Sequence, residues 1–204
     1  MSDDAAWVVP AGISPPPSIP PEIFAAAARA FAAGERLDMQ QLAGSLGISR
    51  ATLYRRAGNR EQLFAAVIWA NSRSTLIEAV RRTSALRGVA RAVAVAAHVL
   101  TVSDHNVSLR RFLATDPEAA LRVLTGAHGG VQEQFIDAFE RLLELEAARG
   151  HLTLRLDLAS VSYAIIRIAE GFLYADVIAD RGRDIDRAVT LIDGLLRGLD
   201  TAGH

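Results

Sequence analysis

The chain has 204 residues, no cysteine and a formal net charge of −1, which excludes disulfides, thiolate metal sites and catalysis by a cysteine nucleophile. A nearly neutral protein cannot hold nucleic acid by bulk attraction, so any DNA contact requires a local cluster of positive charge. Half of the residues are hydrophobic and only 6% are aromatic, a composition typical of packed helices, and because no apolar run approaches the roughly 20 residues that cross a bilayer we expect a cytoplasmic protein with no membrane partner.

The N-terminal segment is rich in proline and has little to bury. We therefore expect residues 1–20 to form a disordered arm. Such an arm reaches the minor groove in several DNA-binding families, but this one has no arginine or lysine to make that contact. The sequence favours a flexible leader that takes no part in DNA binding.

Two helices are predicted next, each bounded by residues suited to its ends. Pro21 fits the first turn of a helix, and Gly34 ends that helix. Asp38 caps a second helix, barely two turns long, which Gly47 ends because glycine tolerates a positive φ.

A third and a fourth helix follow after short turns. Ser49 caps the third, which runs to Gly58. Asn59 caps the long fourth helix, and Gln62 stands three residues on, where its side chain can return a hydrogen bond to the cap. Apolar residues at helical spacing predict the inner face of the fourth helix: Leu63, Phe64, Val67, Ile68, Leu76, Ile77 and Val80.

The stretch between Asp38 and Glu61 has no acidic residue but contains four arginines: Arg50, Arg55, Arg56 and Arg60. Two short helices joined by a tight turn are what a helix–turn–helix requires, since the first helix braces the second in the major groove. Because no acid lies within the stretch to pair with these arginines, we interpret them as DNA contacts rather than as a solvated surface.

The same stretch resembles the TetR family of bacterial transcription regulators. The resemblance lies in Leu42-Ala43, Gly47-Ile48-Ser49, Thr52-Leu53-Tyr54 and Asn59-Arg60-Glu61-Gln62-Leu63. The form Leu-Tyr-Arg-x-x-Gly-x-Arg-Glu over residues 53–61 is also similar to a subgroup found among actinobacterial regulators of quorum-signal degradation. The resemblance implies an all-α fold of nine or ten helices, with a helix–turn–helix DNA-binding domain over residues 21–66 and a helical ligand-binding and dimerisation domain over residues 67–204.

The resemblance also makes the third helix the recognition helix. Arg50 and Ala51 would stand at its exposed N-terminal end, where arginine hydrogen-bonds guanine and a methyl side chain meets thymine. Tyr54 and Arg55, one turn further on, would touch bases or sugars, and Thr52, Arg56 and Arg60 would contact phosphates. The full set of expected DNA contacts is Gln40, Ser49, Arg50, Ala51, Thr52, Tyr54, Arg55, Arg56 and Arg60.

Beyond residue 84 the pattern stays helical, with breaks near Gly88, Asp104, Asp116-Pro117, Gly129-Gly130, Gly150 and Gly182. Residues 184–199 form the clearest amphipathic helix, and the almost continuously apolar segment 157–179 is its expected partner. Within residues 184–199, Gly194 and Gly198 stand four residues apart, and their missing side chains would let another helix approach closely. These features predict a homodimer, with interface residues Ile166, Ile185, Val189, Ile192, Gly194, Leu196 and Gly198.

The family resemblance further implies a pocket for an unknown small-molecule effector. The candidates for its lining are aromatic residues and polar residues on apolar faces, namely Trp69, His98, Phe112, Phe135, Tyr163, Arg167, Glu170 and Tyr174. Each has a structural alternative, because aromatic residues at helical spacing also form a core. Arg167 and Glu170 could pair with each other, pair across a dimer axis or orient the ligand.

Motifs for catalysis are absent from the sequence. The five histidines lack the spacing of a zinc site, and there is no nucleophile elbow, phosphate-binding glycine loop or dinucleotide fingerprint. We therefore expect no enzyme activity, no cofactor and no metal.

Together these features predict a TetR-type regulator, a repressor that a small molecule releases from a palindromic DNA operator. The alternatives are an activator or ligand-independent regulator of the same fold, or a helical small-molecule-binding protein or enzyme that does not bind DNA.

Overall fold

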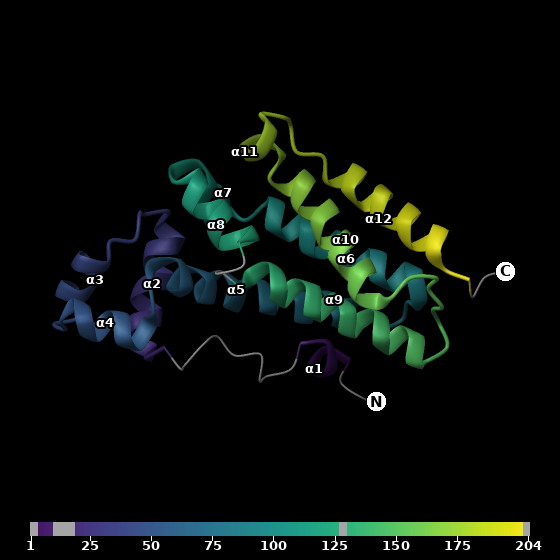
Figure 1. Cartoon of the computed structure of the whole chain (residues 1–204), viewed down its shortest axis with the longest axis horizontal. Helices are drawn as coiled ribbons and strands as arrows, with labels where there is room; N and C mark the ends of the chain where they lie inside the picture. Colours follow the sequence, from purple (N-terminus) through teal and green to yellow (C-terminus); the bar gives the residue numbers. More distant parts are fainter. Residues whose placement is uncertain (1–3, 10–18, 127–129, 202–204) are drawn as a thin grey trace. The chain divides into compact units, whose positions relative to one another are not determined.

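The computed structural model describes residues 4–9, 19–126 and 130–201. Within these ranges it contains twelve helices and one isolated antiparallel bridge, between Leu154 and Asp200 (Figure 1). The expected all-α fold is confirmed, and the two helices beyond the expected ten are five-residue segments, α1 and α11. The helices are α1 (Asp4–Val8), α2 (Pro21–Ala33), α3 (Met39–Ser45), α4 (Arg50–Ala57), α5 (Arg60–Arg82), α6 (Gly88–Asp104), α7 (Val107–Thr115), α8 (Pro117–Thr125), α9 (Val131–Ala148), α10 (Leu158–Leu173), α11 (Ala175–Ala179) and α12 (Ile185–Leu199).

The contacts divide the chain into two compact units. The head unit comprises Gly12–Asn71 and Asn106–Gln132, and the body unit comprises Met1–Ala11, Ser72–His105 and Glu133–His204. Helix α5 contributes its first half to the head unit and its second half to the body unit. Helices α7 and α8, distant in sequence from the helix–turn–helix, belong with it in the head unit.

The helix ends in the head unit are set by the side chains that the sequence indicated. The Asp38 carboxylate accepts hydrogen bonds from the backbone N–H groups of Gln40 (2.7 Å) and Gln41 (3.0 Å) at the start of α3. At the start of α5, the Gln62 N–H donates to Asn59 Oδ1 (2.8 Å) and the Asn59 N–H donates to Gln62 Oε1 (2.9 Å). The predicted reciprocal cap is therefore confirmed.

Three phenylalanines form the centre of the head unit. The rings of Phe31, Phe64 and Phe112, from α2, α5 and α7, meet edge to face with centroids 5.1–6.1 Å apart, a favoured arrangement for aromatic pairs. Gly34 ends α2 with φ 71°, and a Cβ at this position would lie 2.8 Å from the Arg111 side chain on α7. Both features hold α7 against α2.

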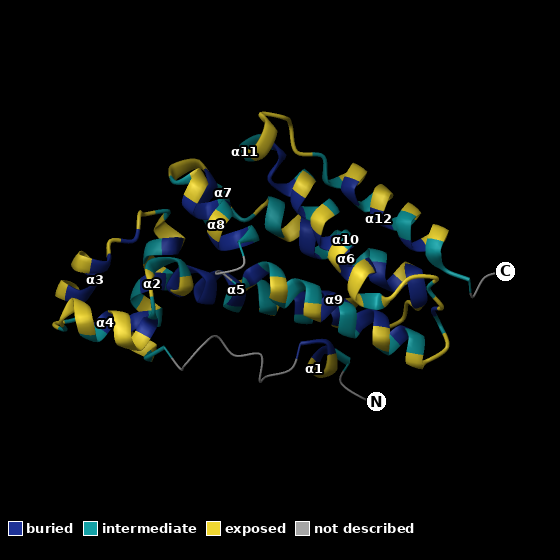
Figure 2. Ribbon diagram, viewed as in Figure 1, coloured by how far each residue is buried: buried dark blue, intermediate teal, exposed yellow. Residues whose placement is uncertain are grey.

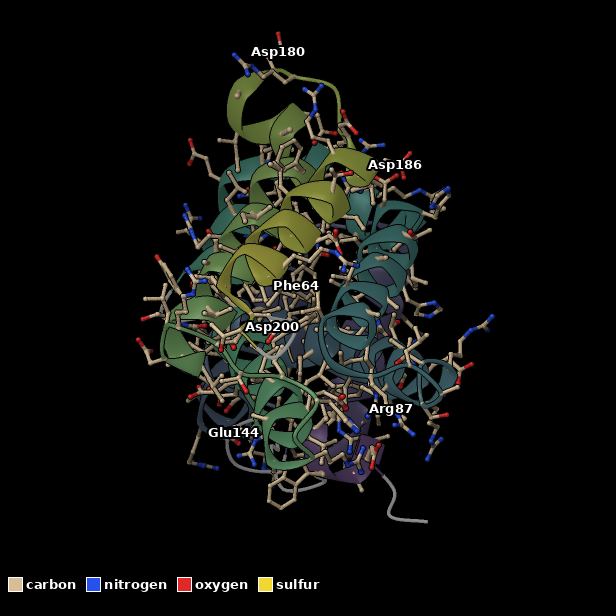
Figure 3. The ribbon with its side chains drawn as sticks, turned by 90° about the vertical axis from the view of Figure 1, so that its right-hand side faces the viewer. Phe64, Arg87, Glu144, Asp180, Asp186 and Asp200 are labelled. Atoms are coloured by element: carbon tan, nitrogen blue, oxygen red, sulfur yellow. The ribbon has the colours of Figure 1, made fainter. Side chains whose placement is uncertain are left out.

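The body unit is built around α12, which packs on α6 and α10. Ala188, Ile192 and Leu196 on its inner face are completely buried, and Figure 2 shows the alternation of buried and exposed turns along this helix. Past the end of α12, the Thr201 N–H donates to the Thr153 carbonyl (2.8 Å). Figure 3 marks the two ends of the helix with Asp186 and Asp200.

The N-terminal segment differs from the expectation of a disordered arm. Asp4–Val8 form α1, and Ala5, Val8 and Val9 are buried in the body unit. The prediction is wrong for residues 4–9, because three small apolar side chains and one carboxylate suffice to attach this short segment. The proline-rich part of the predicted arm, residues 10–18, lies outside the described residues.

Candidate nucleic-acid interface

The turn between α3 and α4 fixes the start of the recognition helix. Gly47 has φ 64°, and the Ile48 N–H donates to the Ala43 carbonyl (3.1 Å), so the chain reverses within a few residues. Ser49 Oγ then accepts a hydrogen bond from the Thr52 N–H (3.1 Å) and donates one to Thr52 Oγ1 (3.0 Å). The predicted cap of α4 is confirmed, and the cap holds the N-terminal turn of α4 in place.

Helix α4 has one buried face and one exposed face. Leu53 and Ala57 are buried against the rest of the head unit, so the opposite face points to solvent. Seven of the nine expected DNA contacts are exposed. Gln40 is on α3, and the other six are on or next to α4: Ser49, Arg50, Ala51, Tyr54, Arg55 and Arg56. Thr52 is half-buried and engaged with Ser49.

Arg50 and Tyr54 interact on this exposed face. The Arg50 guanidinium carbon lies 5.9 Å from the centre of the Tyr54 ring, one helical turn further on, at the outer limit of a cation–π contact. No ion pair is recorded for Arg50, Arg55 or Arg56 among the described residues. The face therefore presents three positive charges and an aromatic ring to solvent.

Arg60 departs from the sequence prediction. Its Nη2 lies 2.7 Å from Asp116 Oδ2 at the start of α8, and both side chains are largely covered. The hydrogen bond from Arg60 lowers the pKa of the Asp116 carboxyl. The expectation that no acid pairs with the arginines is thus wrong for Arg60, because the acid comes from 56 residues further along the chain.

The structure also adds an arginine that the sequence reasoning missed. Arg36 Nε lies 3.6 Å from the same Asp116 oxygen, and the Arg36 side chain is largely exposed. Arg36 precedes Asp38 and so falls just outside the acid-free stretch that directed attention to the other arginines. Asp116 therefore forms ion pairs with two arginines of the head unit. It also caps α8 by accepting a hydrogen bond from the Ala119 N–H (3.4 Å).

A shallow hollow of about 190 Å³ lies beside the C-terminal end of α4. Its lining includes Tyr54, Arg55, Gly58 and Gln62, together with Ile19 from the segment before α2. The chain thus enters the head unit next to the recognition helix.

The expected effector residues fall in both units and differ in burial. Trp69, Phe112 and Tyr174 are buried, His98 and Phe135 are half-buried, and Tyr163 and Arg167 are exposed. Phe112 packs against Phe31 and Phe64 in the aromatic core of the head unit, so it has the structural role that was its alternative. For Arg167 and Glu170, the structure shows the first of the three options, since Arg167 Nη1 lies 3.0 Å from Glu170 Oε2.

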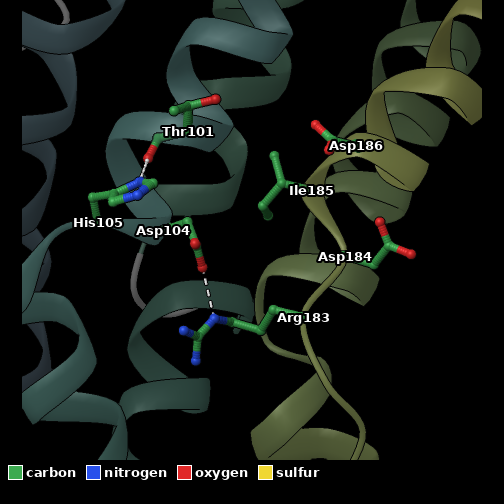
Figure 4. A pocket seen from close by; sticks show the side chains of 7 residues that line it. All are labelled: Thr101, Asp104, His105, Arg183, Asp184, Ile185 and Asp186. Atoms are coloured by element: carbon green, nitrogen blue, oxygen red, sulfur yellow. Dashed lines mark hydrogen bonds and ion pairs between the residues drawn. The ribbon is translucent and has the colours of Figure 1, made fainter.

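The body unit has a hollow of about 300 Å³ between the end of α6 and the start of α12. Figure 4 shows its polar lining, in which Arg183 Nε donates to Asp104 (2.6 Å) and the His105 ring contacts the Thr101 carbonyl (2.8 Å). None of the eight expected effector residues lines this hollow or the one beside α4. Among the described residues, no three histidine, aspartate or glutamate side chains are placed to hold a metal ion.

The expected dimer residues separate into two groups. Ile166, Ile192 and Leu196 are buried within the protomer, where the chain's own helices cover them, and their contact with a partner stays a prediction. Ile185 and Val189 are half-buried, and Gly194 and Gly198 are exposed, with open space where their Cβ atoms would lie. Leu191, which the sequence analysis missed, is 47% exposed on the outward face of α12.

The fold and the exposed face of α4 define a helix–turn–helix DNA-binding protein with an all-helical body. Residues 23–67 match "Bacterial regulatory proteins, tetR family" and residues 87–197 match "Tetracyclin repressor-like, C-terminal domain". The chain belongs to the TetR family and is a TetR-type transcription regulator.

A solved structure agrees with this assignment. It is described as the R. erythropolis transcriptional repressor QsdR from the TetR family, and it is similar to this chain with a TM-score of 0.78 and 28% sequence identity, covering 86% of this chain and 92% of its own. No curated protein matches the chain. None of the described helices is long and apolar enough to span a membrane.

Proposed function

We propose that this regulator is a cytoplasmic repressor, without enzyme activity, that binds a palindromic DNA operator as a homodimer and leaves it when a small molecule binds. One observation carries the proposal: the N-terminal half of α4 presents Arg50, Ala51 and Tyr54 to solvent on a face with no acidic residue. Because the cap at Ser49 holds this end of α4, its side chains can enter the major groove in a defined orientation. The similarity to a structure described as a TetR-family repressor supports repression.

Within this proposal the exposed residues have different roles. Arg50 reads guanine through O6 and N7, and the Ala51 methyl group meets thymine. Tyr54 and Arg55 contact bases or sugars further along the groove, and Arg56 contacts phosphate. Gln40, Ser49, Thr52 and Arg60 complete the proposed set, with Arg60 free to meet a phosphate only after it loosens its ion pair with Asp116.

The proposed dimer forms through the outward faces of α10 and α12. On α12, Gly194 and Gly198 leave room for a second helix, and Leu191 adds exposed apolar surface. Ile185 and Val189 remain partly available to a partner. A two-fold dimer would place two recognition helices about 34–36 Å apart, one turn of DNA, or somewhat further, and so would require an operator with matching symmetry.

Effector release is proposed as a shift in population between two arrangements of the protein. The proposed division of the chain is a DNA-binding domain over 21–66 and an effector and dimerisation domain over 67–204, which the family matches over 23–67 and 87–197 support. His98, Phe135 and Tyr174 remain the proposed effector contacts in the body unit. Membership of the subgroup that resembles regulators of quorum-signal degradation is also a proposal, supported by the residues 53–61.

The experiment is a mobility-shift titration of the protein on the DNA upstream of its own gene, at several salt concentrations. Arg50→Ala is expected to weaken specific binding by about 1–3 kcal/mol, which is roughly 5- to 150-fold, and to relax the preference at one base position. Arg82→Ala is the matched control, because Arg82 is an exposed arginine on the body-unit part of α5, away from the proposed DNA and dimer contacts. A carrier or enzyme would show no salt-sensitive specific binding, and an Arg50 variant with unchanged base preference would refute the assigned role.

A further inference from the structure

One exposed arginine of the head unit lies outside the recognition helix and has no role in the proposed function. Arg36 stands in the short segment between α2 and α3, and its side chain is 74% exposed. Leu37 and Met39 are buried, whereas Asp38 is exposed and has an extended backbone (φ −99°, ψ 114°). Because side chains alternate between the two sides of an extended chain, Arg36 and Asp38 face outward together, from a segment that its buried residues hold in place.

Asp38 lies close to Arg36 and also to the start of the recognition helix. Backbone hydrogen bonds from Gln41 and Gln40 lower the pKa of the Asp38 carboxyl, and the nearby charges of Arg50 and Arg36 lower it further. Both guanidinium groups are therefore near the N-terminal end of α3. In a helix–turn–helix the first helix crosses the DNA backbone while the second enters the groove, so a phosphate would pass this end of α3.

Asp116 holds Arg36 less firmly than it holds Arg60. The Nε atom of Arg36 lies 3.6 Å from Asp116 Oδ2, whereas Nη2 of Arg60 lies 2.7 Å from the same oxygen. The Arg60 side chain is also 23% exposed, against 74% for Arg36. Because an ion pair of an exposed side chain contributes little to stability, Arg36 can exchange Asp116 for a DNA phosphate while Arg60 keeps its partner.

We propose that Arg36 is a DNA-backbone contact: its guanidinium leaves Asp116 and binds a phosphate of the strand that passes the start of α3. The proposal rests on the proposed function and adds a residue to its site, and every residue that it uses belongs to the head unit. A phosphate contact contributes to affinity and orientation but carries no base preference. In this Arg36 differs from Arg50, which the proposed function assigns to base reading.

The test is the salt dependence of binding by the full chain, on the DNA upstream of its own gene and on a duplex of arbitrary sequence. Arg36→Ala is expected to reduce the slope of log K against log salt by about 0.9 for each head. At about 0.1 M salt this corresponds to a roughly eightfold loss of affinity per head, on both duplexes. Arg36→Lys keeps the charge and is expected to retain the wild-type slope.

Arg29→Ala is the matched control, because Arg29 is an exposed arginine of the same unit, on α2. We expect this variant to leave the slope almost unchanged. An equal loss in Arg29→Ala would show that only the total charge matters, and a loss confined to the upstream DNA would show a base contact. Either result would overturn the phosphate contact, as would a wild-type slope in Arg36→Ala.

A second measurement locates the contact on the DNA. The chain has no cysteine, so Arg36→Cys provides a single thiol to which an iron chelate that cleaves nearby DNA backbone can be attached. We expect cleavage in the bound complex beside each half-site. Cleavage that is absent from the complex, or spread evenly along the duplex, would contradict the proposed position of Arg36.

The Arg50 variant separates this inference from the proposed function. If Arg50→Ala relaxes the base preference while Arg36→Ala leaves the slope unchanged, the proposed function stands and the Arg36 contact is refuted. If the wild type binds neither duplex, the proposed function fails and the Arg36 contact fails with it.

Discussion

Replacing Asp116 by asparagine is expected to strengthen nonspecific DNA binding and to steepen its dependence on salt. The Asp116 carboxylate holds Arg60 at 2.7 Å and lies 3.6 Å from Arg36, so it competes with DNA phosphates for both. Asparagine keeps the shape of the side chain and remains a good cap for α8. The change therefore removes one negative charge beside the head arginines with little effect on the fold.

The size of the effect follows from the release of counterions. If each head gains one phosphate contact through Arg60, the slope of log K against log salt steepens by about 0.9 per head, or about 1.8 for the proposed dimer. At about 0.1 M salt, one such contact corresponds to roughly an eightfold increase in affinity. The measured increase should be smaller than this. A partly exposed ion pair contributes only about 0–1 kcal/mol, so Arg60 of the wild type can also leave Asp116 and contact a phosphate.

The assay is fluorescence anisotropy on a duplex of arbitrary sequence, from low to moderate salt. Glu118→Gln is the matched control, since Glu118 lies two residues away, its side chain is 89% exposed and its ion-pair partner is Arg122. An equal change in both variants would show that only the total charge matters. An unchanged slope in Asp116→Asn would refute the assignment of Arg60 to phosphate.

Three further predictions concern stability. Phe112→Ala should lower the free energy of unfolding in urea by about 3–5 kcal/mol, because its ring packs against Phe31 and Phe64; a loss below about 1 kcal/mol would be inconsistent with a core residue. Glu146→Ala should lower it by about 3–5 kcal/mol, since Arg91 then loses its main buried partner, and near-neutral behaviour would contradict this role. The pKa of Asp4 is lowered from 3.8 by Arg149, so its contribution to stability is present above pH 3.8 and is lost as the pH falls through the lower, folded-state value. The difference in unfolding free energy between wild type and Asp4→Asn should therefore disappear in acid, and a difference that persists there would show that charge is not its cause.

The helix–turn–helix could be predicted closely from the sequence because its signals are local. Asp38 and Ser49 cap helices that begin one residue later, and Gly34 and Gly47 adopt the positive φ that ends a helix. These residues act within one turn of their own positions, so spacing along the chain is enough to recognise them. Arg50 is the first residue of α4, next to the Ser49 cap, and it is exposed there.

Contacts between distant segments could not be predicted in this way. The sequence around Arg60 contains no acid to pair with it, yet the fold brings Asp116 to it across 56 residues. Asp4 and Arg149 lie 145 residues apart, and neither has a local pattern that indicates the other. For α12, periodicity identified the apolar stripe but not its cover, and Ile192 and Leu196 are covered by α6 and α10 of the same chain.

The positions of the two tryptophans give the protein a built-in spectroscopic reporter. Trp7 on α1 is 54% exposed, whereas Trp69, in the head-unit part of α5, is 1% exposed. A solvated indole emits at longer wavelength than a shielded one and is more easily quenched by acrylamide. Intrinsic fluorescence can thus follow both parts of the protein without any added dye. The acrylamide-quenchable emission of Trp7 reports on the N-terminal helix, and the shorter-wavelength emission of Trp69 reports on unfolding of the head unit.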